Sequence, residues 1–161
     1  NGAILSFDPN IREPLWKDME DARTQMAYGL SVCDILKISD NEIQWFSAKE
    51  DYTEGIHMLQ QTYQIPLILL SMGRDGSRAY YKDMLVEVPA FLQKNTIETT
   101  GAGDTFGACC LHHILKYGLD NLTKQQLKEM LTFANAAASI ITTRKGALRV
   151  MPSLEEIQRL L

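Results

Sequence analysis

The stretch Leu67-Ile68-Leu69-Leu70-Ser71 constrains the fold of this chain more than any other segment. It is almost entirely apolar, whereas a strand with one face in water alternates apolar and polar residues. A strand of this kind is covered on both faces, as in a parallel sheet that lies between two layers of helices. Short apolar runs elsewhere alternate with stretches whose apolar residues recur at helical spacing. The sequence therefore predicts an α/β protein built as a three-layer α/β/α sandwich with a mostly parallel sheet.

Other strands and helices follow from the same patterns. Apolar runs predict strands at 3–7 and 35–38, and residues 77–81 and 85–88 are expected to form a hairpin. Helices are expected over 16–30 and 123–141, in the stretches after Ser39 and Thr53, between Gly101 and Gly118, and after Ser153. A capping box, a hydroxyl followed three residues later by Glu or Gln, opens three of them, at Ser39, Thr123 and Ser153. Because a buried strand stands almost at the first residue, we expect residues 1–161 to be a single α/β domain from the later part of a longer protein.

Composition excludes several classes of function. Hydrophobic residues make up 45% of the 161 residues, charged residues make up 22%, and the net charge is −4. No basic cluster indicates a nucleic-acid partner, and no apolar run is long enough to span a membrane. The three cysteines are odd in number and lack metal-like spacing, which favours thiols in a reducing cytoplasm. We therefore expect a cytoplasmic protein.

A glycine-rich stretch, Thr99-Thr100-Gly101-Ala102-Gly103-Asp104-Thr105-Phe106-Gly107, indicates the site. It leads directly into an apolar run with helical spacing, so a loop opens into a helix. Glycine lets a ligand approach the backbone, and the first amides of a helix have no partner inside it. Such a position binds phosphate, and Asp104 beside it is placed to take a proton from an attacking hydroxyl. The alternative is that Asp104 caps the helix and the glycines only form a turn.

Two further loops strengthen this hypothesis, because both follow predicted strands. Met72-Gly73-Arg74-Asp75-Gly76 is a second glycine loop, and Asp8-Pro9-Asn10-Ile11-Arg12 follows the first strand. Open α/β sheets bind ligands at the carboxyl ends of their strands. Two glycine loops and an Asp-Pro-Asn-x-Arg segment in such positions predict a ligand site far more strongly than one glycine loop does.

These segments, in this order, resemble those of the ribokinase-like (PfkB) carbohydrate kinases. The resemblance rests on Asp8–Arg12, Lys37–Glu42, Ser71–Gly76, Thr99–Asp104 and Asn135–Ala138, and residues 7–16 look most like fructokinases. It covers the whole chain but only the C-terminal half or so of a full-length member. It implies a Rossmann-like ribokinase fold and transfer of the ATP γ-phosphoryl group to a sugar hydroxyl.

The resemblance also implies roles for individual residues. Asp104 is the base, and Gly101, Ala102 and Gly103 supply amides to the transferring phosphoryl group. The positions that match the nucleotide site are Ser39, Ser71, Gly73, Gly76 and Asn135. Asn10 and Arg12 match the phosphate or sugar site. A structural helix asparagine is the alternative for Asn135, and a surface salt bridge is the alternative for Arg12.

Two metal sites are implied by the resemblance. Glu42 matches a glutamate that holds Mg²⁺, often through water, although it is also the capping-box residue and that role alone would explain it. The positions that match a monovalent-cation site, for potassium, are Glu98, Thr100, Ile141, Arg144, Gly146 and Val150. Glu98 stands where aspartate is commoner, and Val150 has no side-chain oxygen.

We therefore expect an ATP-dependent sugar kinase of fructokinase type that uses Mg²⁺. The sugar pocket of the family lies mainly in its N-terminal half, so we expect the isolated chain to bind ATP weakly and to turn over sugar slowly or not at all. One alternative is a kinase for ribose, 2-keto-3-deoxygluconate or a nucleoside, and another is a nucleotide-binding fragment without catalysis. Core surface exposed by a missing half would favour a homodimer.

Overall fold

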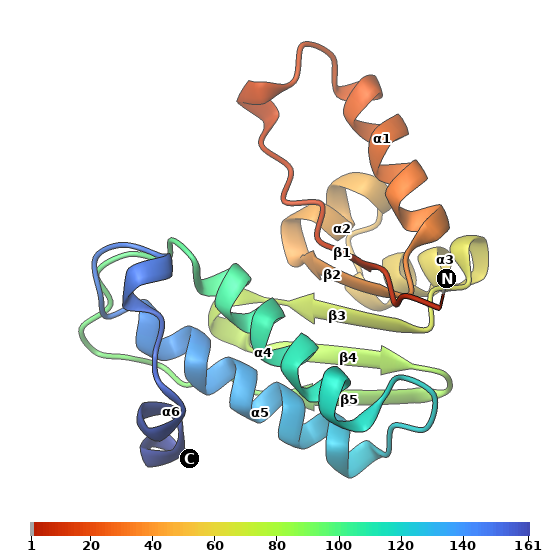
Figure 1. Cartoon of the computed structure of the whole chain (residues 1–161). Helices are drawn as coiled ribbons and strands as arrows, with labels where there is room; N and C mark the ends of the chain where they lie inside the picture. The colour runs from red at the N-terminus through yellow and green to blue at the C-terminus, as the bar shows by residue number, and fades with distance from the viewer. Residues whose placement is uncertain (1) are drawn as a thin grey trace. The chain divides into compact units, whose positions relative to one another are not determined.

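The computed structural model describes residues 2–161, which form two compact units. The first unit comprises residues up to Ser71 together with Tyr80–Asp83, and the second comprises Met72–Ala79 and Met84–Leu161. The five strands are hydrogen-bonded in the order β1-β2-β3-β4-β5 (Figure 1). The predicted α/β class is confirmed.

The first unit is built around three parallel strands. Strand β1 (Ser6–Phe7) pairs with β2 (Ile35–Ser39), and β2 pairs with β3 (Leu67–Ser71). In the register of β2 and β3, Ile35 lies opposite Leu67 and Ser39 opposite Ser71. The apolar residues of β2 and β3 are buried, which confirms that the apolar run at 67–71 is a covered strand. Its helices are α1 (Met19–Val32), α2 (Asp40–Ser47) and α3 (Tyr52–Tyr63), and a 3-10 turn spans Glu13–Leu15.

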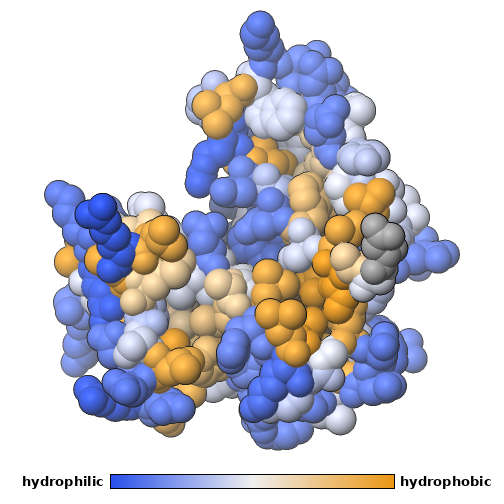
Figure 2. Space-filling view, viewed as in Figure 1, coloured by the Kyte–Doolittle hydropathy of each residue, from blue (hydrophilic) through white to orange (hydrophobic). Residues whose placement is uncertain are grey.

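The prediction of a buried strand at 3–7 is wrong in its first half. Strand β1 holds only Ser6 and Phe7, and the side chains of Ile4 and Leu5 are each 49% exposed. Strand β1 lies at the edge of the sheet order, so only β2 pairs with it. Figure 2 shows apolar side chains on the surface around the start of the chain. The first strand is therefore short and incompletely covered among residues 2–161.

Arg23 connects α1 to the end of α2. Its Nη1 donates to the Phe46 carbonyl at 2.7 Å, and its Nη2 donates to the Trp45 carbonyl at 3.1 Å. Its guanidinium carbon also lies 4.6 Å from the centroid of the Trp45 ring. The last carbonyls of a helix lack partners within it, and a cation there also complements the helix dipole. Arg23 therefore caps α2 from a neighbouring helix.

The second unit contains the hairpin and the remaining helices. Strands β4 (Ser77–Tyr81) and β5 (Met84–Val88) are joined by a two-residue turn in which Lys82 has a φ of +53°, and β4 also contributes its last residues to the first unit. The helices are α4 (Ala102–Tyr117), α5 (Lys124–Ile141) and α6 (Leu154–Leu160), with 3-10 turns at Gly73–Asp75 and Leu148–Val150.

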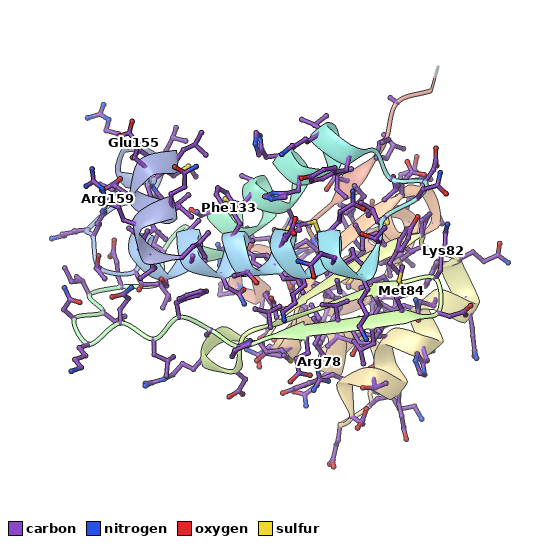
Figure 3. All side chains as sticks on the ribbon, turned by 90° about the horizontal axis from the view of Figure 1, so that it is seen from below. Arg78, Lys82, Met84, Phe133, Glu155 and Arg159 are labelled. Carbon is purple, nitrogen blue, oxygen red and sulfur yellow. The ribbon has the colours of Figure 1, made fainter. Side chains whose placement is uncertain are left out.

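Helix α5 lies at the centre of the second unit. It packs against α4, β5 and α6, and Figure 3 shows it running along β5 with Glu155 and Arg159 of α6 pointing away from it. Its buried face includes Leu127, Met130, Leu131 and Ala134, which is the apolar stripe that the sequence predicts. The three predicted capping boxes are all present. None of the helices in residues 2–161 is long and apolar enough to cross a membrane.

We predict that Arg23→Ala lowers the free energy of unfolding by about 2–3 kcal/mol, because two carbonyls at the end of α2 lose a charged donor. Arg23→Lys should recover part of the loss, since an ammonium reaches one carbonyl but lacks the planar fork. Urea unfolding followed by tryptophan fluorescence measures the difference, with Lys17→Ala as the matched control on an exposed side chain. Equal losses for Arg23→Ala and Lys17→Ala would contradict the capping role.

Candidate active site

The first turn of α4 presents backbone amides that have no partner. Its N-cap, Gly101, has a φ of +78°, and no side chain caps the helix. The amide of Ala102 donates to the Thr99 carbonyl at 3.1 Å, and the amide of Thr105 donates to the Gly101 carbonyl at 2.9 Å. Within residues 2–161, no oxygen accepts from the amides of Gly103 or Asp104. These donors lie at the positive end of a 16-residue helix, where an anion binds well.

One of the three backbone amides that the sequence predicts as phosphate donors is not free. The expected donors are Gly101, Ala102 and Gly103, but the Ala102 amide is already bonded within the turn at Thr99. An amide that donates to a carbonyl at this distance is a poor donor to a ligand. The adjacent free pair is Gly103 and Asp104, one residue further along the helix.

The Asp104 side chain is exposed and lies on the same helical turn. The alternative role, a cap of α4, is not what the structure has, because α4 lacks any side-chain cap. The next residue, Thr105, is 3% exposed, and its hydroxyl has no hydrogen-bond partner among the described residues. Sequence reasoning missed Thr105, for which the only signal is its position beside Asp104. This turn thus combines free amides, an accessible carboxylate and an unsatisfied hydroxyl.

The second glycine loop forms a tight turn in the same unit. The Met72 amide donates to the Gly76 carbonyl at 2.9 Å, and the Asp75 amide donates to the Met72 carbonyl at 3.0 Å. Gly76 has a φ of +102°, and a Cβ there would lie 2.1 Å from the Val88 carbonyl oxygen. Gly73 also has a positive φ, and nothing lies within 4 Å of the place where its Cβ would be. Only glycine fits at Gly76, whereas Gly73 leaves open space beside the backbone.

Asn135 is buried, and all of its polar atoms are engaged. Its Oδ1 accepts from the Ser77 hydroxyl at 2.9 Å. Its Nδ2 donates to the carbonyls of Val88 and Pro89, each at 3.1 Å. An amide side chain has two donor hydrogens, and both are used here. The contacts favour the structural alternative for Asn135, in which it joins α5 to the start of β4 and the end of β5.

We predict that Asn135→Ala lowers the free energy of unfolding by about 2–4 kcal/mol, because a buried hydroxyl and two carbonyls lose their partner. Asn121→Ala, at an exposed position, is the matched control and should change stability by less than about 0.5 kcal/mol. Chemical unfolding gives the stabilities, and calorimetry gives the dissociation constant for ATP. A variant that keeps its stability but loses ATP affinity would instead place Asn135 at the nucleotide.

In the first unit, two contacts tie down the Asp8–Arg12 loop. The Lys37 ammonium lies 3.1 Å from one Asp8 carboxylate oxygen and 3.3 Å from the other. The Ile11 amide donates to Glu42 Oε1 at 2.8 Å. The other carboxylate oxygen of Glu42 accepts from the amide and the hydroxyl of Ser39, at 2.9 and 2.7 Å. The loop is thereby anchored to β2 through Lys37 and to the first turn of α2 through Glu42.

These contacts show which of the predicted site residues in the first unit already have hydrogen-bond partners within the protein. Glu42 serves the capping box and the loop, and the hydroxyl of Ser39 is engaged with it. Ser71 donates to the Ile38 carbonyl at 3.4 Å. Asn10 is exposed with a φ of +44°, and exposed Arg12 forms no ion pair with any of residues 2–161. Arg12 is thus available to an anion, whereas the surface salt bridge offered as its alternative is not found in this part of the chain.

We predict that the Asp8–Lys37 pair stabilises the first unit. Lys37 is buried among the apolar residues Ile35, Leu36 and Ile38 of β2, so Asp8→Ala should lower the free energy of unfolding by about 2–3 kcal/mol. In a double-mutant cycle with Lys37→Met, the second substitution should cost at least about 1 kcal/mol less than it does alone. Urea unfolding of the four proteins gives the coupling. Additive losses would show that the two charges do not interact.

No group of three or more His, Cys, Asp or Glu side chains in residues 2–161 is arranged to hold a metal ion. Glu98, at one predicted monovalent-cation position, instead accepts from the Gly146 amide at 2.5 Å. Thr100, at another, is exposed. The cysteines do not form an alternative site, since burial raises the pKa of both Cys33 and Cys109 to about 11. These two thiols are protonated at neutral pH and are poor nucleophiles.

Free amides at the start of a helix, beside an exposed carboxylate, can bind an anion such as a phosphate group. The family model for pfkB family carbohydrate kinases matches residues 1–154. The chain belongs to this family.

Curated relatives and solved structures agree with that assignment. Over 160 residues, which are 99% of this chain, it is 35% identical to fructokinase-1 of Zea mays, and over 159 residues it is 35% identical to the fructokinase of Klebsiella pneumoniae. A crystal structure of Vibrio cholerae fructokinase, with fructose, ADP and a calcium ion bound, matches with a TM-score of 0.86 and 27% identity, over 97% of this chain and 50% of that one. The chain spans 49% of the maize protein and 51% of the Klebsiella protein, about half the length of each.

Proposed function

We propose that the protein containing this chain transfers the γ-phosphoryl group of ATP to a sugar hydroxyl, with fructose as the acceptor. The observation that carries the proposal is the pair of unpaired amides at Gly103 and Asp104 beside the exposed Asp104 carboxylate. The relatives support the acceptor, since both curated proteins named above are fructokinases and the Vibrio enzyme binds fructose and ADP. Because the chain spans about half of those two proteins, the activity is proposed for the intact protein.

In the proposed reaction, Asp104 accepts the proton of the attacking hydroxyl, and the free amides bind the oxygens of the transferring phosphoryl group. General-base catalysis typically contributes about 10²–10⁴-fold to the rate. One preorganised donor to the developing charge contributes about 2.7–4 kcal/mol. The open backbone at Gly73 and the turn closed by Gly76 support a place for the nucleotide at residues 72–76.

A divalent cation is part of the proposal, and we propose Mg²⁺. Kinases of this chemistry use it to offset the charge of the phosphates. The Glu42 carboxylate already accepts three hydrogen bonds from Ile11 and Ser39, so we propose that it meets the ion through water.

Three further expectations accompany the proposal. The residues that complete the sugar pocket are proposed to lie in the part of the relatives' length that this chain does not span, and the intact protein is proposed to be cytoplasmic and to form a homodimer. The exposed Ile4 and Leu5 side chains at the edge strand β1 support an additional covering segment there. The isolated chain should therefore turn over sugar far more slowly than the intact protein does.

We predict that Asp104→Asn in the intact protein lowers kcat for fructose by about 10²–10⁴-fold, because the acceptor loses its base. The dissociation constant for ATP should change little, since the amides of α4 remain. Asp83→Asn, in the exposed turn between β4 and β5, is the matched control and should leave both quantities unchanged. A coupled ADP assay gives kcat, and calorimetry gives ATP binding. Wild-type turnover by Asp104→Asn would remove Asp104 from the mechanism.

The same assay separates the alternatives. Fructose, ribose, 2-keto-3-deoxygluconate and a nucleoside are compared by kcat/KM at saturating MgATP. Preference for fructose supports the proposal, and a strong preference for another acceptor would overturn the choice of sugar but not the transfer. ATP binding without transfer to any acceptor would favour the non-catalytic alternative, which the fructokinase relatives do not favour.

A further inference from the structure

The outer edge of strand β5 has backbone groups that no strand in residues 2–161 pairs with. Strand β5 is the last in the sheet order, so its only hydrogen-bonded neighbour in the sheet is β4 (Figure 1). In a hairpin with a two-residue turn, the residues that flank the turn exchange hydrogen bonds, and every second residue after them does the same. Here Tyr81 and Met84 flank the turn, so the backbone groups of Leu85 and Glu87 point away from β4. An edge of this kind can accept an added strand.

The side chains of the hairpin agree with this alternation. Arg78 of β4 lies opposite Glu87 in such a hairpin, and its Nε is 2.6 Å from the Glu87 carboxylate. Val86 and Val88 are buried, whereas Leu85 is 43% exposed and Glu87 is exposed. Because α5 packs against β5, the two valines face α5, and the Leu85 and Glu87 side chains lie on the opposite face of the strand.

A hollow lies beside this edge, between β5 and the beginning of α5. It has a volume of about 550 Å³ and is lined by Leu85, Val86, Glu87, Lys124, Gln125 and Lys128. The two lysines are exposed and one helical turn apart on α5. Neither forms an ion pair with a carboxylate among residues 2–161, whereas Glu87 is paired with Arg78. The hollow is therefore positively charged, although the net charge of the chain is −4.

This charge disfavours a second copy of the chain as the added strand. Antiparallel pairing of β5 with its own copy is two-fold symmetric, so the second Lys124 and Lys128 would meet the first pair at the same edge. Like charges brought together across an interface oppose association. An acidic strand would instead form charge pairs with the same lysines, so the hollow favours a negatively charged occupant.

We propose that the β5 edge binds an extended segment of another protein as an added strand, in which acidic residues alternate with apolar ones. Backbone hydrogen bonds to Leu85 and Glu87 supply the affinity of such a contact, and alternate side chains supply its specificity. Successive side chains of a strand point to opposite faces. The acidic side chains therefore lie on the α5 side, against Lys124 and Lys128, and the apolar side chains lie beside Leu85.

This edge is remote from the proposed phosphate site. Gly101, at the start of α4, packs on Ile141, which is the last residue of α5, whereas Lys124 is its first. At 1.5 Å per residue, the two ends of α5 are about 25 Å apart. Binding at β5 thus does not depend on the proposed transfer of a phosphoryl group, and it is measured without any transfer assay.

The test uses the intact protein and two labelled peptides of identical composition and charge. One alternates, as Glu-Val-Glu-Val-Glu-Val, and the other is blocked, as Glu-Glu-Glu-Val-Val-Val. Fluorescence anisotropy should show the alternating peptide binding at least about tenfold more tightly, because only it places all its acidic side chains on one face. Equal affinities would show that charge alone attracts the peptides and would overturn the proposal, as would the failure of both to bind.

Variants test the two lysines. The double variant Lys124→Glu/Lys128→Glu should weaken binding of the alternating peptide at least about tenfold, because attraction becomes repulsion. Lys17→Glu/Lys116→Glu changes the net charge equally at exposed positions elsewhere and is the matched control. Equal losses in the two double variants would overturn the role assigned to the hollow. The comparison of peptides on the wild-type protein stands even if a variant fails to fold.

Amide hydrogen exchange tests the backbone contact. The Leu85 and Glu87 amides should exchange rapidly in the intact protein alone, and at least about tenfold more slowly with the alternating peptide bound. Slow exchange without the peptide would show that another part of the protein or a second copy already covers the edge, and would overturn the proposal. Unchanged exchange on binding would place the peptide elsewhere and would overturn it as well.

Discussion

The absence of a side chain at Gly101 is the constraint on which the start of α4 depends. Its φ of +78° is a conformation that other residues adopt only at a cost, and its backbone lies against Ala147 and Ile141. Because Gly101 is the N-cap, its conformation sets the direction in which the following amides point. A larger residue there would have to move either the helix or the turn after α5. The free amides of Gly103 and Asp104 are therefore a consequence of packing at the residue before the helix.

The other long helices show why this start is unusual. Side-chain oxygens of Asp18, Ser39, Asp51 and Thr123 accept from the first amides of α1, α2, α3 and α5. A protein that can cap a helix with a side chain gains about 1 kcal/mol by doing so. Helix α4 forgoes that gain, since glycine stands at its N-cap. Among the six α-helices that residues 2–161 form, only α4 begins without a side-chain cap, and the proposed site rests on this difference and on the exposed carboxylate beside it.

Local signals in the sequence predict most of the fold and little of its long-range contacts. The capping boxes, the strand at 67–71 and the hairpin follow from residues close together in the chain, and all are present. The end of α2 is not predictable in the same way, because Ala48 adopts a positive φ without being glycine. The Asp8–Lys37 pair joins residues 29 positions apart, and the contact of Ile11 with Glu42 joins residues 31 positions apart. Only the pairing of β1 with β2 brings them together, although a lysine within an apolar strand is a visible signal.

Residues of a family motif either support the loops or contact a ligand, and their hydrogen-bond partners distinguish these two roles. Asn135, Glu42 and Glu98 all stand at positions that match ligand sites, yet the structure engages their polar atoms with Ser77, Ile11 and Gly146. A polar side chain with its capacity filled by protein atoms would have to break those bonds to meet a ligand directly, at a cost of about 1–3 kcal/mol for each group left unsatisfied. What remains for direct contact in the second unit is the backbone of the two glycine loops and the carboxylate of Asp104. In the proposed site, the side chains of the motif build the loops and the main chain that they position is left to meet the phosphates, a division of roles that favours glycine in these segments.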